Sequence, residues 1–247
     1  VRSSAASDVY KRQTFIGAMM LASITAIAYA SIGSHTLHPY FALAVLGLAA
    51  ATSRMKVKLP GINGNMSVNL PFLLTAAVNL SAVEAVLITC VSTAVQCWPG
   101  KGAKLKPQQM AFNLSMMSFA SAAASVTFHA GWLSRMQWNT STLGFVLATL
   151  ALFLGQTAPV AGIVAVSEGK SAMQTWRNLA LLSFPYYVVS AGITSMVQAV
   201  SVHLGWELAL AVFPVMFVIH RCYHLYFSGM AESMRSDMLV RAARAGA

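Results

Sequence analysis

Apolar stretches alternate with short polar segments along almost the whole chain. Eight such runs occur, at 14–32, 39–53, 67–81, 82–98, 108–130, 142–166, 178–202 and 206–222. A helix that crosses a bilayer needs about 20 apolar residues, within a range of about 17–25. The fifth to seventh runs fit that length well, whereas the second, third and fourth are short. The pattern predicts an all-α integral membrane protein in which residues 14–222 form a bundle of about eight transmembrane helices.

The third and fourth runs are almost continuous, with a break near Ser81–Glu84. One interpretation is a tight helical hairpin of two short crossings. The other is a single long segment that is bent or re-entrant. Basic residues flank the pair on both sides, and one turn near Asn79–Ser81 would return the chain to its starting side. These features favour the hairpin.

Basic residues are distributed very unevenly among the connecting segments. After residue 13, twelve of the thirteen Lys and Arg follow an even-numbered run, and only Arg135 follows an odd-numbered one. Because basic loops stay on the cytoplasmic side, every even-numbered exit is expected inside the cell. The sequence therefore predicts a multi-pass protein of the bacterial cytoplasmic (inner) membrane with both termini in the cytoplasm.

Composition supports the membrane class and narrows the partners. The chain is 57% hydrophobic and 9% charged, whereas soluble domains carry about 25% charged residues. The formal net charge of +10 is spread over loops on one predicted side. That distribution favours contact with the anionic lipids of the inner leaflet over nucleic acid, which we do not expect as a partner. Nothing in the composition identifies a cofactor.

The first residues, VRSSAASDVYKRQ, differ from the rest of the chain in charge and composition. They resemble a translated sequencing-adapter read. Residues 1–13 are therefore interpreted as a non-native leader and set aside from reasoning about the fold.

The segment 54–69 is the most distinctive connection in the chain. It is basic, then contains Pro60 and Gly61, then Gly64, and then a new apolar run. The glycines permit tight turns, Ser67 is expected to cap the next helix, and Asn69 to bond within its first turn. One interpretation is a signal-relay loop that contacts a partner domain, and the other is a well-formed turn with basic residues at the inner leaflet.

Polar side chains inside the runs are few and are expected to face other helices, because lipid offers them no partner. We expect hydrogen bonds between helices at Asn79, Asn113, Gln156 and Gln198.

Histidines and acids gather at the predicted outer face, where they would form a metal site or a pH sensor if they converged. The alternative is ordinary polarity at the depth of the lipid headgroups. The members of this predicted outer cluster are His35, His38, His129, His203, Glu84 and Glu207.

A stripe of apolar and aromatic residues with helical spacing comes after the last run. Its members are Tyr223, Tyr226, Met230, Met234 and Met238. Charged residues fall largely off this stripe, so residues 223–247 are predicted to form a cytoplasmic amphipathic linker helix. It either lies on the inner leaflet or pairs with a second copy to form a homodimer.

Three segments resemble the multi-pass membrane sensor regions of bacteria that precede GGDEF cyclase or HD-type phosphodiesterase domains. The first is Leu59–Pro60–Gly61 with Gly64, Met66, Ser67 and Asn69. The second is Pro107, Gln109, Phe112 and Asn113, and the third is Tyr223–His224–Leu225–Tyr226. The likeness covers most of residues 40–230.

The resemblance implies an input region that relays a signal to a cytoplasmic domain that makes or degrades cyclic di-GMP. This chain contains no GGDEF motif, EAL motif or HD pair, and it lacks the common soluble catalytic motifs. It is therefore expected to be a non-enzymatic input region separated from its output domain. The alternative is a small-molecule transporter or a vitamin-type substrate-binding membrane component.

Overall fold

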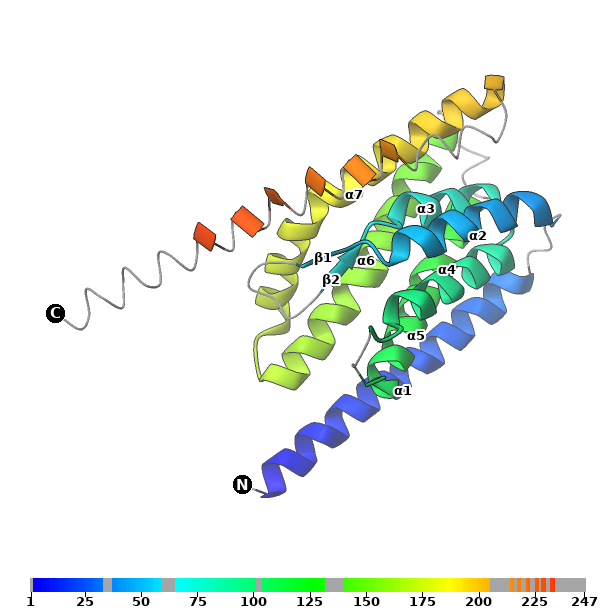
Figure 1. The fold of residues 1–247 in the computed structure, drawn as a ribbon. Helices are drawn as coiled ribbons and strands as arrows, with labels where there is room; N and C mark the ends of the chain where they lie inside the picture. The colour runs from blue at the N-terminus through cyan, green and yellow to red at the C-terminus, as the bar shows by residue number, and fades with distance from the viewer. Residues whose placement is uncertain are drawn as a thin grey trace.

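The computed structural model describes residues 2–32, 37–58, 65–100, 104–131 and 140–204, with six residue pairs between 214 and 233. Its elements are α1 (Arg2–Ile32), α2 (Pro39–Ser53), β1 (Lys56–Lys58), β2 (Asn65–Ser67), α3 (Leu70–Asn79), α4 (Ala82–Cys97), α5 (Pro107–Phe128), α6 (Thr140–Glu168) and α7 (Ala172–Leu204). Figure 1 shows the helices packed side by side, with one small pair of strands beside α2.

Four helices of the described part are long and apolar enough to cross a membrane. They contain the spans Val9–Ile32, Pro107–Phe128, Thr142–Glu168 and Ala172–Ala199. Side chains along α6 and α7 such as Val146, Leu181 and Phe184 are exposed, as expected for helices that face lipid. The structure thus supports a helical membrane protein but not the predicted count of eight crossings, because α2, α3 and α4 are shorter apolar helices.

The third and fourth apolar runs fold as two helices, broken at Leu80 and Ser81. The prediction of two crossings fails for α3, because its 10 residues extend only about 15 Å, half of a hydrocarbon core of about 30 Å. Residues 70–78 of α3 are all buried. A helix surrounded by protein has no lipid-facing side, so α3 serves as an interior element.

A capping box starts α4. The Ser81 hydroxyl accepts from the Glu84 backbone N–H, and the Glu84 carboxylate accepts from the Ser81 N–H and hydroxyl at 3.1 and 2.7 Å. The same carboxylate accepts the His38 backbone N–H at 2.9 Å, just before α2. One buried acid therefore joins the starts of α2 and α4.

The segment before α3 is more ordered than a turn. β1 and β2 pair antiparallel, with Lys56 opposite Ser67. The predicted cap is wrong: Asn69 is the N-cap residue of α3, without a side-chain capping bond, while Ser67 donates to the Ser53 carbonyl at 3.0 Å. Ser67 is the last residue of β2 and is paired with Lys56, before the chain turns into α3. Its hydroxyl therefore bonds the Ser53 carbonyl at the end of α2 and not the first turn of α3.

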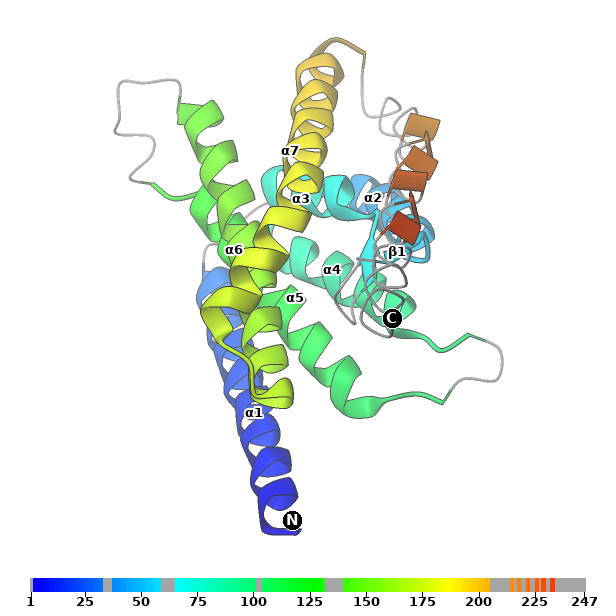
Figure 2. The same cartoon turned by 90° about the vertical axis from the view of Figure 1, so that its left-hand side faces the viewer.

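The small-residue helix α5 occupies the centre, as its Ser and Ala content suggests. It packs against α1, α4 and α6, and Figure 2 shows it between these helices. Gly155 of α6 meets Ala120 of α5 so closely that an added Cβ would lie 2.8 Å from the Ala120 Cβ. Small side chains allow such approach where lipid supplies no hydrophobic drive between helices.

The structure bears on the predictions for the two ends of the chain in different ways. The proposed leader boundary at residue 13 falls inside α1, which is continuous from Arg2 to Ile32. The first part of α1 projects beyond the other helices in Figures 1 and 2. Of the predicted tail stripe only Tyr226 is described, and it is 62% exposed; Tyr223, Met230, Met234 and Met238 lie outside the described residues, so the predicted tail helix is not confirmed.

Candidate functional site

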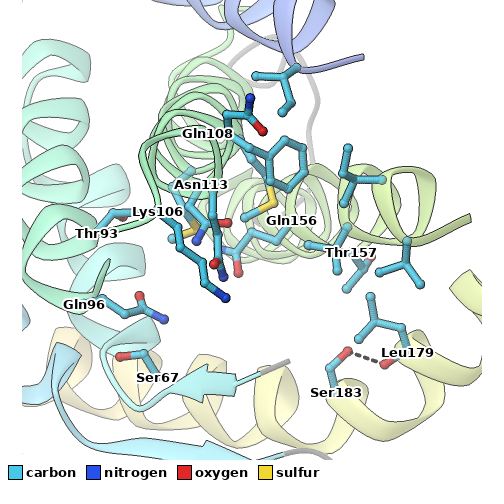
Figure 3. Close-up of a pocket in the computed structure, with 18 of the residues that line it drawn as sticks. Ser67, Thr93, Gln96, Lys106, Gln108, Asn113, Gln156, Thr157, Leu179 and Ser183 are labelled. Atoms are coloured by element: carbon cyan, nitrogen blue, oxygen red, sulfur yellow. Dashed lines mark hydrogen bonds between the residues drawn. The ribbon is translucent and has the colours of Figure 1, made fainter. Parts of the chain in front are cut away.

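A cavity of about 830 Å³ is lined by residues of α1, β2, α3, α4, α5, α6 and α7. This volume falls within the range of about 300–1,000 Å³ that is usual for small-molecule sites. Apolar side chains such as Leu73, Phe112 and Leu179 form part of its wall. Figure 3 shows polar side chains from several elements facing the same space.

Polar atoms that lack a hydrogen-bond partner gather at this cavity. Five buried side-chain atoms in the described part of the chain have none, and those of Asn69, Thr93, Gln156 and Arg12 belong to lining residues. Asn69 and Thr93 are 3% and 1% exposed. Buried polar groups in native proteins are nearly always satisfied, so unpartnered ones on a cavity wall indicate a missing polar partner.

Thr93 is the most informative of these residues. Helical threonines elsewhere in the chain, such as Thr89 and Thr157, donate to the carbonyl four residues earlier. The Thr93 hydroxyl has no partner among the described residues. Because Thr93 is also a lining residue, its hydroxyl is a candidate donor to a molecule bound in the cavity.

The charged lining residues are basic. Lys106 precedes α5 and is exposed, and Figure 3 shows its side chain extending toward the space between Gln96 and Ser183. Arg12 also lines the cavity, and none of the described lining residues is acidic. Arg12 belongs to the predicted foreign leader, so we assign the site to Lys106 and the uncharged donors.

Two adjacent tyrosines of α7 connect the cavity to the rest of the bundle. Tyr187 donates to the Gln156 carbonyl oxygen at 2.5 Å and thereby orients that amide, whose Nε2 is left without a partner in the described part. Tyr186 donates to the Ser67 carbonyl at 2.9 Å and accepts the Leu70 N–H at 3.2 Å. The tyrosine pair links α7 to α6 on one side and to the start of α3 on the other.

Tyr186→Phe is expected to destabilise the bundle by about 1–3 kcal/mol, because it leaves the buried Leu70 N–H without an acceptor. The loss is measured by titrating the protein in mixed micelles with a denaturing detergent. Tyr29→Phe is the matched control, because Tyr29 is 65% exposed on α1 and its loss of a hydroxyl costs little. Equal stability of the two variants would contradict a stabilising role for the Tyr186 hydrogen bonds.

The cavity brings together residues from separate predicted groups. Ser67 and Asn69 of the relay segment line it with Asn113 and Gln156. The other relay residues, Pro60, Gly61 and Gly64, lie outside the described part. Ser67 and Asn69 therefore line the same cavity as Lys106, which lies in the next basic connection along the chain.

All four predicted intramembrane polar residues bond across helices. Asn113 donates to the Cys97 sulfur at 3.3 Å, and Gln198 donates to the Asn79 carbonyl oxygen at 3.3 Å. Gln156 accepts from Tyr187. Asn113 and Gln156 additionally line the cavity, a role that their positions in the sequence did not suggest.

The predicted outer cluster is not assembled by the described residues, among which no group of three or more His, Cys, Asp or Glu converges. His129 bonds the Ser125 carbonyl through Nδ1 at 2.9 Å, and Glu84 acts as a helix cap. The side chain of His203 and the residues His35 and Glu207 lie outside the described part, so a site that includes them stays a prediction.

Sequence reasoning did not identify Thr93, Lys106, Tyr186 and Tyr187 as site residues. The sequence could have indicated the tyrosines, because two adjacent phenols in an apolar run both require hydrogen-bond partners. Thr93 had no such signal, since a threonine in a helix usually bonds its own backbone.

Comparison of the chain with models of protein families, with curated proteins and with solved structures finds no match in any of the three.

Proposed function

We propose that this chain is the ligand-binding input region of a signalling protein in the bacterial cytoplasmic membrane. The cavity supports this proposal most directly, because Asn69, Thr93 and Gln156 line a space large enough for a small molecule and each has a side-chain atom without a partner among the described residues. Buried polar atoms in native proteins are nearly always satisfied, and four of the five exceptions among the described residues belong to residues that line this cavity. The output is proposed to be a cyclic di-GMP cyclase or phosphodiesterase domain, in keeping with the sequence resemblance.

The contacts of α7 provide a route from the cavity to the rest of the protein. A ligand that bonds Gln156 competes with or reinforces the Tyr187 hydroxyl on the same amide. Tyr186, the preceding residue, holds the start of α3. Pro185 lies inside α7 immediately before this pair, and a proline inside a helix removes a backbone bond and permits a bend. A ligand shifts the equilibrium between two arrangements of α7 by an amount set by the difference in its affinity for them.

The proposal is tested by joining the chain to a diguanylate cyclase domain and measuring cyclic di-GMP in cells. Thr93→Phe places a ring in the cavity and is expected to change the output about fivefold or more, the size of a typical allosteric coupling. Val91→Phe is the matched control, because Val91 lies on the same helix with 42% of its surface exposed. Removing residues 222–247 from the fusion is expected to abolish the difference between the two variants.

Identical output from wild type, Thr93→Phe and Val91→Phe, all folded and in the membrane, would contradict the signalling role. The second candidate, a substrate-binding component of a transporter, uses the same cavity and the interior helix α3. Uptake of a solute into vesicles that contain the protein, lost in Thr93→Phe, would favour that candidate.

A further inference from the structure

The chemistry of the cavity narrows the class of ligand. We propose that it binds an amphipathic anion, a molecule with a carboxylate or phosphate head and an apolar body. This inference rests on the proposed binding role and adds the charge and polarity of the ligand. The observation behind it is the asymmetry of the described lining, which combines hydrogen-bond donors and two basic side chains, Arg12 and Lys106, with apolar walls and no acid.

The unpartnered atoms are predominantly donors. Gln156 is fixed by Tyr187, which takes its carbonyl oxygen and leaves its Nε2 without an acceptor in the described part of the chain. Asn69 Nδ2 also lacks an acceptor there, and the Thr93 hydroxyl is able to donate. Donors without acceptors on residues that line one cavity call for a ligand rich in acceptor oxygens.

Charge selects an anion among acceptor-rich ligands. Lys106 extends into this space and forms no ion pair with the described residues. An ammonium at the edge of a cavity whose described lining holds no acid stabilises a negative head and repels a positive one. The start of α5 adds the partial positive charge of a helix N-terminus at Pro107 and Gln108, which line the same cavity.

The remaining lining of the cavity is apolar, which is why we expect the ligand to have an apolar body as well. Leu70 and Leu73 of α3, Met116 and Met117 of α5, and Leu179 of α7 line the cavity. A small inorganic anion would leave these surfaces in contact with water, whereas an alkyl or ring system would cover them. Two sources have this shared chemistry: an anionic lipid of the bilayer and a free amphipathic acid.

The test uses the full chain in nanodiscs of phosphatidylcholine and equilibrium dialysis with radiolabelled decanoate, with empty nanodiscs as the background. Wild type is expected to bind decanoate saturably, without competition from decyltrimethylammonium, which has the same tail and the opposite charge. Lys106→Gln is expected to weaken binding about tenfold, the usual size of one charge-assisted hydrogen bond. Lys104→Gln is the matched control, because Lys104 is exposed two residues away and does not line the cavity.

Thr93→Val tests the buried donor without changing the size of the side chain, and it is expected to weaken decanoate binding about fivefold. Nanodiscs that contain phosphatidylglycerol separate the two sources. Loss of decanoate binding there indicates that a lipid occupies the cavity, whereas unchanged binding indicates a free acid.

Two results would overturn the inference. One of them leaves the proposed binding role standing, and the other refutes it as well. Saturable binding of decyltrimethylammonium or decanol in preference to decanoate, blocked by Thr93→Phe, refutes an anionic ligand but keeps the binding role. If wild type and Thr93→Phe retain the same amount of each amphiphile without saturation, both the anionic ligand and the proposed binding role are refuted.

Discussion

Glu84→Ala is expected to lower the free energy of unfolding by about 2–5 kcal/mol. The side chain is buried, with 8% of its surface exposed, and its carboxylate accepts from three donors: the Ser81 N–H, the Ser81 hydroxyl and the His38 N–H. Alanine leaves these donors without their acceptor at the starts of two helices. Each buried donor left unsatisfied costs about 1–3 kcal/mol, and partial rehydration at the helix ends reduces the total.

Two further variants at the same cap give graded losses in a denaturing-detergent titration. Glu84→Gln keeps a carbonyl oxygen that accepts one of the donors, so its loss is expected to be about half that of alanine. Ser81→Ala removes only the hydroxyl of the capping box and is expected to cost about 1 kcal/mol. A loss below about 1 kcal/mol for Glu84→Ala would contradict the cap.

The same residue separates a capping role from a metal role. The sequence placed Glu84 in a possible outer metal site, whereas the structure uses its carboxylate to join α2 and α4. If the carboxylate stabilises the fold as a cap, a chelator leaves the stability of the wild-type protein unchanged. A chelator that lowers wild-type stability and has no effect on Glu84→Ala would restore the metal interpretation.

The hydrophobic pattern predicted the class of the protein better than its detailed arrangement. Length and apolarity located α1, α5, α6 and α7, because a helix in lipid must satisfy its backbone alone and therefore has a minimum length. The same criterion misjudged the third run, because apolar residues suit the protein interior as well as the bilayer. Only packing distinguishes the two, and α3 is enclosed by α2, α4, α5, α6 and α7.

The site was predicted in part, and the reason differs from residue to residue. Asn113 and Gln156 were identified because an amide within an apolar run must have a partner. Thr93 was not, because its composition fits an ordinary helix and only the geometry shows that its hydroxyl has no acceptor among the described residues. Lys106 was only one of the basic residues that follow an even-numbered run, and its place at the cavity depends on how α5 packs against α4 and α6.

Gly155→Ala is expected to destabilise the bundle by about 1–3 kcal/mol, although alanine ordinarily favours a helix over glycine. The new Cβ would lie 2.8 Å from the Cβ and 2.9 Å from the Cα of Ala120, which is fully buried on α5. Backbone cannot move aside as a flexible side chain does, so α5 and α6 must separate. Detergent titration measures the loss.

Gly192→Ala is the matched control, because an added Cβ at this position in α7 meets nothing within 4 Å. Its expected effect is neutral, or a gain of up to about 1 kcal/mol from helix propensity. Ala120→Gly in the Gly155→Ala background removes the opposing methyl, so the double variant is expected to be more stable than the sum of the two single changes predicts. Strict additivity would mean that the two positions do not touch, and α5 would then lose its role as the central helix against which α6 is fitted.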